Sequence, residues 1–257
     1  MRQALEHADA SPVLPRLGGM ARPDGVVIVS ERHWAFAGVD GSLVEGRMPV
    51  LPGLVRRVPL LRGLARLVLA FAPVMRRGGA TRPFERVGLL AAVVLPFGLV
   101  LVSERIALAT GFALTAILVW MLFRGRTLAL HGAEHRAIAA AEEHRLAATW
   151  EGSNRPSRFS LRCGTNFAAL AAPVTFAADQ VWPLSVALWT PVAVTMLSLA
   201  LTMELWQLVQ GSSSRFARAF LLPGLALQRL TTREPSLDET RVALRAVDSV
   251  LRRSLQS

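Results

Sequence analysis

The chain has one cysteine, no tyrosine and few charged residues for its length. A single cysteine, Cys163, excludes an internal disulfide framework. Charged residues make up 18% of the 257 positions and hydrophobic residues 52%, and the mean hydropathy is +0.40. Low charge combined with high apolar content excludes a disordered chain and argues against a single soluble enzyme domain. The composition predicts a membrane protein.

Lysine is also absent: all 29 basic residues are arginines, and the net charge is +11. A basic excess suits an anionic partner, either lipid headgroups or nucleic acid. The apolar content favours the lipid bilayer and its anionic headgroups. The sequence lacks the interleaved aromatic and basic residues that stack nucleic-acid bases, so RNA or the ribosome ranks last as a partner. Assembly into a homo-oligomer is left open.

Four apolar segments are candidates to enter a bilayer: Val87–Val102, Ile106–Phe123, Phe167–Trp182 and Leu184–Met203. A transmembrane helix needs roughly 20 residues, with a range of about 17–25, and the second and fourth segments meet this requirement. The first and third are short, so they either borrow flanking residues, cross a thin bilayer or are re-entrant. Only three residues, Ser103–Arg105, separate the first pair, which predicts a tight helical hairpin.

The arginines predict the orientation. Residues 1–86 hold 13 arginines, residues 124–165 hold 7, and residues from 204 onward hold 8. Arginine-rich loops stay on the cytoplasmic side, so four spans place both termini and the 124–165 segment in the cytoplasm, at the inner (plasma) membrane. The first 19 residues contain no long apolar run, so we expect no cleavable signal peptide.

The fold class that we expect is mainly α: a polytopic α-helical membrane protein with about four transmembrane helices. The expected segments are a cytoplasmic β-containing part at 1–50, interfacial amphipathic helices at 51–82, a transmembrane hairpin at 83–123, a cytoplasmic helix and loop at 124–165, a second transmembrane hairpin at 166–204 and a cytoplasmic tail at 205–257. A small N-terminal β element and a C-terminal amphipathic helix should pack below the membrane.

Local patterns support these segments. In Gly25–Arg47, alternating apolar runs flank Asp40-Gly41, a strong signal for a β-hairpin. The stretch Pro52–Met75 is apolar but carries four arginines, which suits helices lying in the membrane surface, interrupted by prolines.

The tail shows the pattern of an amphipathic helix. Ser236 and Glu239 have the spacing of a capping box. Apolar residues follow at helical spacing: Leu237, Leu244, Val247, Leu251 and Leu255. We expect this helix to dock on the rest of the protein by that stripe.

The segment after the second apolar stretch, RTLALHGAEHRAIAAAEEHRLAATW, has the composition of a helix. Helical spacing places five of its residues on one face: His131, Glu134, His135, Ile138 and Glu142. Two histidines at i and i+4 can reach one metal ion, and H-x-x-E-H is the pattern of inverted zinc hydrolases. The pattern makes His131 and His135 candidate ligands of a divalent metal such as zinc. Glu134 is the candidate catalytic base.

A third ligand is needed, and Cys163 and Glu142 are the two candidates. Cys163 precedes the third apolar segment, where Thr165 is the expected helix cap and Arg162 is adjacent. Both the helix end and the arginine would lower the pKa of the thiol. Packing and a nucleophilic role remain alternatives for this cysteine. For the polar face as a whole, the alternatives to a metal site are hydrogen bonding to the arginine-rich surface and a metal-free functional site.

Two arginines are candidates to contact an anionic substrate. Arg162 precedes the cysteine, and Arg233 lies in LQRLTTREP, a pattern of helix end and turn. A guanidinium binds phosphate or carboxylate groups in a bidentate manner. Pairing with a carboxylate of the same chain is the alternative for Arg233.

Three stretches together resemble the YqhQ-like family of bacterial membrane proteins: HGAEH (His131–His135), RCGT (Arg162–Thr165) and PGLALQRLTTREP (Pro223–Pro235). The stretches GGMARPDGV and PLLRG are similar to the opening motifs of that family. The resemblance covers nearly the whole chain from about Gly18 onward. It implies a multi-span membrane protein of unknown function, described as a predicted metal-dependent enzyme.

The chain departs from the family pattern at several positions. Ser160 stands where the family has a histidine three residues before its cysteine. Met20 replaces a glutamine and Asp24 a glutamate in the opening motif, Val29 replaces an arginine, and Arg241 replaces a glutamate. If the missing histidine is a ligand, metal binding by this chain is weakened or lost.

The sequence therefore supports a membrane-bound, metal-dependent and hydrolytic enzyme with a cytoplasm-facing site. The alternative is a non-catalytic membrane scaffold or docking protein that uses its arginine-rich surface to hold anionic lipid or a partner. The two readings differ in whether the polar face forms an open site or is packed against arginine side chains.

Overall fold

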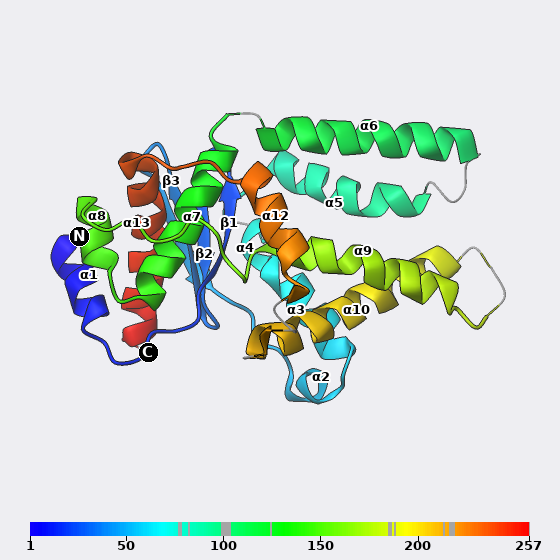
Figure 1. Cartoon of the computed structure of the whole chain (residues 1–257), viewed down its shortest axis with the longest axis horizontal. Coiled ribbons are helices and arrows are strands. Elements are labelled where there is room, and N and C mark those ends of the chain that lie inside the picture. Colours follow the sequence, from blue (N-terminus) through cyan, green and yellow to red (C-terminus); the bar gives the residue numbers. More distant parts are fainter. Residues whose placement is uncertain are drawn as a thin grey trace.

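The computed structural model describes residues 1–76, 79–81, 83–98, 104–123, 125–184, 187, 189–212, 214–215 and 219–256. A small β-sheet and the helices α7 (Thr127–Glu142) and α13 (Leu237–Leu255) form the body of the protein. Four further helices extend from this body to one side, on the right in Figure 1: α5 (Pro83–Gly98), α6 (Glu104–Phe123), α9 (Gly164–Gln180) and α10 (Thr190–Gly211).

The sheet is an antiparallel meander in the order β1-β2-β3-β4. Its strands are β1 (Gly18–Arg22), β2 (Gly25–Val29), β3 (His33–Gly38) and β4 (Leu43–Arg47). The predicted turn is present: Gly41 has φ +90°, and the Asp40 carboxylate accepts a hydrogen bond from the Ser42 backbone N–H at 3.0 Å. The sequence did not predict β1, because its Gly-Gly start lacks the apolar alternation of a strand.

The core lies where α7 and α13 pack on the sheet. Val26 and Ile28 of β2, Leu244 and Val247 of α13 and Leu130 of α7 are fully buried within it. The predicted stripe of α13 docks only at its centre, because Leu237 and Leu255 at its two ends are 38% and 39% exposed. Two short helices, α1 (Arg2–Asp9) and α8 (Leu146–Glu151), contact α13 and each other.

The predicted capping box of α13 is present. The Ser236 hydroxyl accepts from the Glu239 backbone N–H at 3.2 Å, and the Glu239 carboxylate accepts from the Ser236 backbone N–H at 2.9 Å. The cap satisfies donors that would otherwise lack a partner at the start of the helix.

Within the described residues, one helix and not four is long and apolar enough to cross a membrane. That helix is Thr190–Gln210, and Leu108–Ile117 is a shorter apolar stretch. The helices α5 and α9 have 16 and 17 residues, which at 1.5 Å per residue is less than a hydrocarbon core of about 30 Å. Residues 99–103 and 185–186, on which parts of the expected spans and the Ser103–Arg105 turn fall, lie outside the described residues.

The predicted interfacial region forms three short helices, α2 (Gly53–Arg57), α3 (Leu61–Ala70) and α4 (Ala72–Met75). The helix α3 packs on α10, where a Cβ added to Gly63 would lie 3.1 Å from the Ala200 carbonyl oxygen. Arg62 holds this contact by an ion pair, with its Nε 2.9 Å from the Glu204 carboxylate.

The helix α7, which carries the H-x-x-E-H pattern, is separate from α6. The helix α6 ends at Phe123 and α7 begins at Thr127, with Gly125 between them at φ +68°. The chain therefore changes direction between α6 and α7, which places α7 against the sheet.

Candidate metal centre

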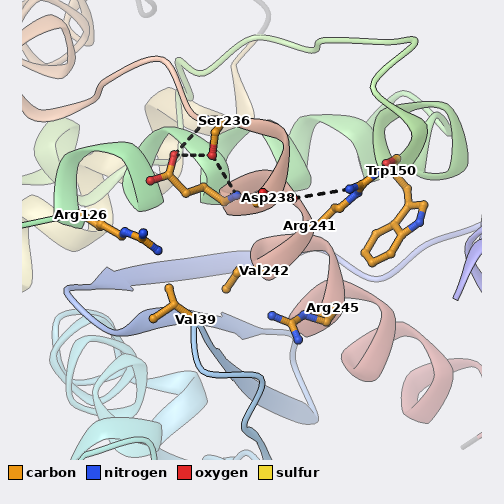
Figure 2. Close-up of a pocket in the computed structure, with 9 residues that line it drawn as sticks. Val39, Arg126, Trp150, Ser236, Asp238, Arg241, Val242 and Arg245 are labelled. Atoms are coloured by element: carbon orange, nitrogen blue, oxygen red, sulfur yellow. Dashed lines mark hydrogen bonds and ion pairs between the residues drawn. The ribbon is translucent and has the colours of Figure 1, made fainter.

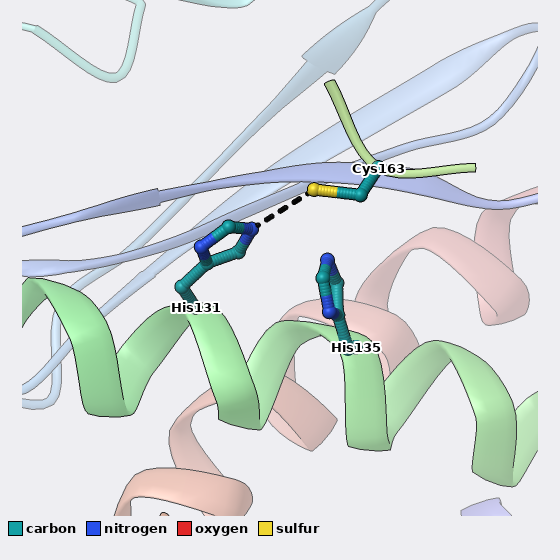
Figure 3. A group of neighbouring side chains, drawn as sticks. All are labelled: His131, His135 and Cys163. Carbon is teal, nitrogen blue, oxygen red and sulfur yellow. Dashed lines mark hydrogen bonds between the residues drawn. The ribbon is translucent and has the colours of Figure 1, made fainter. Parts of the chain in front are cut away.

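Two histidine side chains lie one above the other on α7. Residues four apart share a helix face, and the imidazole centroids of His131 and His135 are 4.5 Å apart. Figure 3 shows both rings pointing toward the sulfur of Cys163, which comes from the segment before α9. The sequence-based expectation that these histidines share one face is confirmed.

Backbone carbonyl groups orient both imidazoles. His131 Nδ1 lies 2.8 Å from the Thr231 carbonyl oxygen, and His135 Nδ1 lies 2.7 Å from that of Arg158. A carbonyl oxygen only accepts hydrogen bonds, so each Nδ1 carries the proton and each Nε2 presents a lone pair. His131 Nε2 is 3.2 Å from Cys163 Sγ, and His135 Nε2 is buried with no hydrogen-bond partner in the described part of the chain.

Burial keeps these histidines neutral. It lowers the pKa of His131, and it lowers the pKa of His135 to about 4, with a further contribution from the neighbouring His131. A neutral imidazole is the form that binds a metal.

Cys163 caps α9 by its own sulfur. Its Sγ accepts hydrogen bonds from the Thr165 backbone N–H at 3.4 Å and from the Thr165 hydroxyl at 3.2 Å. The expectation that Thr165 is the cap is therefore wrong by two residues. The expected fall in the thiol pKa is also wrong: burial raises the pKa of Cys163 more than the two hydrogen bonds from Thr165 lower it.

These three side chains meet the basic requirements of a metal site. In the described part of the chain, the ligand atoms of His131, His135 and Cys163 lie within 4.8 Å of one another. Tetrahedral zinc places a nitrogen and a sulfur ligand about 3.6 Å apart, so small side-chain movements suffice. Two imidazoles and a thiolate suit zinc and leave the fourth coordination position for water or substrate.

Glu134 points to the sheet instead of the solvent. Its carboxylate accepts a hydrogen bond from the Ala21 backbone, and burial raises its pKa to about 8. The contact needs a glycine opposite, because a Cβ on Gly19 would lie 2.8 Å from Glu134 Oε1. The same carboxyl group is close enough to raise the pKa of the Cys163 thiol.

Glu142 and Arg162 pair with each other in an exposed ion pair. Glu142 is not part of the compact ligand group. Of the two expected third ligands, the structure thus brings Cys163, and not Glu142, to the histidine pair. Arg162, expected to contact an anion, has its charge balanced by Glu142.

Arg233 is exposed, and its backbone fastens the TTREP segment to α7. Its N–H donates to the Leu128 carbonyl oxygen at 2.9 Å. The close approach requires Gly132, where a Cβ would lie only 2.2 Å from the Arg233 carbonyl oxygen. The glycine of HGAEH thereby lets the Thr231 carbonyl reach His131.

The buried Arg136 is not among the site residues predicted from the sequence. Its Nε donates to the Pro156 carbonyl oxygen at 3.1 Å, and its Nη2 pairs with Glu234 at 2.6 Å. Pro156 precedes Arg158 by two residues, and Glu234 follows Thr231 by three. One guanidinium therefore ties together the two segments whose carbonyls orient the imidazoles. The only signal in the sequence was an arginine next to His135 on an apolar helix.

The segment before Cys163 is held by a buried polar network. Gln228 of α12 (Leu222–Thr231) accepts from the Ser160 N–H at 2.9 Å and donates to the Ser160 carbonyl at 2.7 Å. Asn166 Nδ2 donates to the same carbonyl at 3.0 Å. The backbone of Ser160 thus fixes the position of the cysteine, and its side chain is not in the ligand group.

The family model for proteins of unknown function DUF1385 matches residues 97–253. The chain belongs to the DUF1385 family. The matched part includes every residue named above for the metal centre except those on β1. The chain is also similar to the "Uncharacterized protein YqhQ" of Bacillus subtilis (strain 168), with 25% identity over an alignment of 298 residues that covers 93% of each chain. No solved structure matches the chain.

The membership in DUF1385 and the likeness to YqhQ confirm the family resemblance drawn from the motifs. One departure from the family pattern has its own partners in the structure. Arg241 lines a hollow of about 380 Å³ at the start of α13 (Figure 2). It donates to the Trp150 carbonyl oxygen at 3.2 Å and lies over the Trp150 ring, 5.5 Å from its centroid. This hollow has no lining residue in common with the metal group.

Proposed function

We propose that this protein is a membrane-bound, metal-dependent enzyme of hydrolytic type. His131, His135 and Cys163 hold the metal, with zinc the best match to two imidazoles and one thiolate. The observation that carries the proposal is the pair of hydrogen bonds from Nδ1 to backbone carbonyls. Metal-binding histidines characteristically donate their second ring N–H in this manner, because that bond fixes the tautomer and the ring orientation.

A divalent cation at this position would acidify water and polarise a carbonyl or phosphoryl oxygen. The chain itself supplies orientation and proton transfer. Thr231 and Arg158 keep both Nε2 lone pairs aimed inward, and Glu134 is the acid–base group nearest to the cluster on α7. Burial of Glu134, His135 and Cys163 limits the access of bulk water and strengthens their electrostatic interactions.

Membrane attachment is the second part of the proposal. Large apolar side chains project from the four extended helices: Val87 of α5, Phe112 of α6, Phe176 of α9 and Leu208 of α10 are 68–76% exposed. Exposed apolar surface of this extent is typical of contact with lipid. The charged body and both termini would lie on the cytoplasmic side, where arginines concentrate.

The topology limits how the helices insert. The chain enters α9 from the body at Cys163 and returns from α10 to α12 and α13. The helix α10 therefore cannot cross alone, because both ends of the α9–α10 pair lead back to one body. We propose that the pair enters the membrane as a hairpin in which α10 reaches the full thickness, with α9 shorter or in locally thinned bilayer.

The metal content of the full chain, purified in detergent without chelator, tests the enzyme proposal. The expected result is close to one zinc or iron per chain in the wild type. It should be lost in His131→Ala, His135→Ala and Cys163→Ala. His7→Ala is the matched control, since His7 is exposed on α1 and remote from the cluster in the sequence, and it should keep the metal.

A well-folded wild type that binds no added Zn²⁺, Fe²⁺ or Co²⁺ would remove the enzyme proposal. The scaffold function would then lead. The ion pairs Glu142–Arg162 and Arg136–Glu234 support that alternative, because they show polar side chains satisfied within the protein. Ser160, in place of the family histidine, would be the reason for the loss of binding.

A further inference from the structure

A cavity of about 410 Å³ lies beside the candidate metal centre. His135 and Ile138 of α7 line it on one side, and Val209 and Gln210 at the end of α10 line it on another. The volume falls within the range of about 300–1,000 Å³ that is typical of small-molecule sites. The cavity is large enough for one end of an elongated ligand, with the metal group at its edge.

Two of the residues that line this cavity have unsatisfied polar atoms. Among the described residues, His135 Nε2 and Gln210 Nε2 are both buried without a hydrogen-bond partner, and His135 Nε2 is the lone pair assigned above to the metal. Native proteins rarely leave buried polar atoms unpaired. The Nε2 group of Gln210 is a donor, so a ligand that satisfies it must bring an acceptor such as a carbonyl oxygen.

The charges around the cavity do not favour an anion. Arg162 lines it but pairs with Glu142, which also lines it, and Glu143 adds a second carboxylate. One guanidinium therefore faces two carboxylates. This balance favours an uncharged acceptor over a phosphate or a free carboxylate.

The lining also has an apolar part that extends to the candidate membrane helix, beside the two serines Ser157 and Ser160. Ile138, Val209 and Leu221 are buried, with exposures of 5%, 5% and 1%. The helix α10, which carries Val209, is the described helix that is long and apolar enough to cross a membrane. The cavity thus lies at the C-terminal end of α10. In the membrane arrangement proposed above, an amphiphile in the bilayer can reach this end of the helix.

We propose that this cavity binds an uncharged acylated amphiphile drawn from the membrane. Its ester or amide carbonyl would lie toward the Gln210 amide donor, at the side of the cavity where His135 reaches the proposed metal, and its acyl chain would lie along Ile138, Val209 and Leu221. That this amphiphile is the substrate of the metal site rests on the proposed function. An apolar wall beside unpaired polar atoms matches the two ends of such a molecule.

Photo-crosslinking of the full chain tests the inference. The protein is placed in nanodiscs of phosphatidylethanolamine and phosphatidylglycerol that contain a minor fraction of a monoacylglycerol with a diazirine in its acyl chain. After irradiation, labelled peptides are mapped by mass spectrometry. Peptides that contain Ile138 and Leu221 are expected to carry label, and excess unlabelled monoacylglycerol should remove it.

Two variants and a control locate the label. Ala139→Phe fills the cavity and Gln210→Leu removes the amide donor; each should lower labelling about tenfold. Ala129→Phe is the matched control, because Ala129 lies on the same helix and is also partly buried but does not line the cavity. Equal labelling in the folded wild type and in either folded cavity variant would overturn the inference. So would displacement by a short apolar peptide but not by monoacylglycerol, which would assign the cavity to a peptide.

Metal content measured on the same samples separates this inference from the proposed function. Cavity labelling of a chain that binds no metal would support the amphiphile site and remove the metal-dependent enzyme. A full complement of metal without cavity labelling would leave the metal centre in place and overturn the amphiphile as its substrate class.

Discussion

The sulfur of Cys163 lies 3.2 Å from Nε2 of His131, although 32 residues separate the two in sequence. His135 adds the third atom of this compact set of ligand atoms. Backbone carbonyl oxygens orient the imidazoles of both histidines. The contact depends on α9 packing against α12 and on the Thr231 and Arg233 backbone reaching α7, so it reports directly on the tertiary structure around the site.

Cobalt substitution should reveal the cysteine as a ligand. A thiolate bound to Co²⁺ gives a charge-transfer absorption in the near ultraviolet, and Co²⁺ in a tetrahedral site gives visible bands. Cys163→Ser should abolish the ultraviolet band and weaken Co²⁺ binding about tenfold or more, because serine is a poor ligand for this class of metal. An unchanged spectrum in the folded variant would mean that Cys163 serves packing alone.

Arg136 should control metal affinity without touching the metal. Replacing it with Met removes the ties to Pro156 and Glu234, so the carbonyls that orient the imidazoles lose their support. Loss of such supporting contacts typically costs about 10–100-fold in metal affinity. Competition with a colorimetric chelator measures this, and the exposed Arg145→Met is the control. Equal affinities for both variants would contradict the positioning role.

Gly132→Ala should disrupt both fold and site. The added Cβ would fall 2.2 Å from the Arg233 carbonyl oxygen, which is backbone and cannot easily move. Overpacking of this kind costs about 1–3 kcal/mol in the free energy of unfolding. Gly164→Ala is the matched control, because nothing lies within 4 Å of its added Cβ. Denaturant titration in detergent should show a clear loss for the first variant and little change for the second.

His33 should make the fold sensitive to acid. Burial, together with Arg253, Arg47 and Arg32 nearby, lowers its pKa below the ordinary value of 6.5. The folded state therefore binds this proton less readily than the unfolded state. The resulting stability is fully present above pH 6.5 and is lost as the pH falls toward the lowered folded-state pKa.

Thermal unfolding of the metal-free chain between pH 8 and pH 5 measures that dependence. His33→Asn should reduce the loss of stability on acidification, and His7→Asn on α1 controls for removing an imidazole. The histidines of α7 have lowered pKa values too, so the difference between variant and wild type is the relevant quantity. Parallel curves for His33→Asn and wild type would refute the assignment.

The capping box of α13 should contribute measurably to stability. Ser236→Ala removes the hydroxyl that accepts from the Glu239 N–H and should cost ~1 kcal/mol in the free energy of unfolding. Glu239→Gln keeps a side-chain acceptor at the third helical position and should cost less. The reverse order of the two losses, in denaturant titrations under the same conditions, would show that the cap is not the source of the effect.

The sequence by itself determined the features that depend on neighbours a few residues apart. Helical periodicity placed His131 and His135 on one face, because residues four apart always share a face. The Asp40-Gly41 turn and the Ser236–Glu239 cap were likewise readable, because each is closed by hydrogen bonds within three residues. The motifs also identified the family correctly.

Only the tertiary structure decided which distant groups meet. Cys163, and not Glu142, lies beside the two histidines. Such a contact depends on how the helices pack, which the spacing of residues along the chain does not reveal. The tertiary structure also raised the pKa of Cys163 where sequence predicted a fall, because burial outweighs the cap hydrogen bonds. Composition predicted more membrane-spanning helices than the described residues contain. Apolar content indicates a preference for lipid, but the length of each helix depends on where the helix begins and ends. The carbonyls that orient the imidazoles could not be predicted, because backbone groups carry no signature in the sequence.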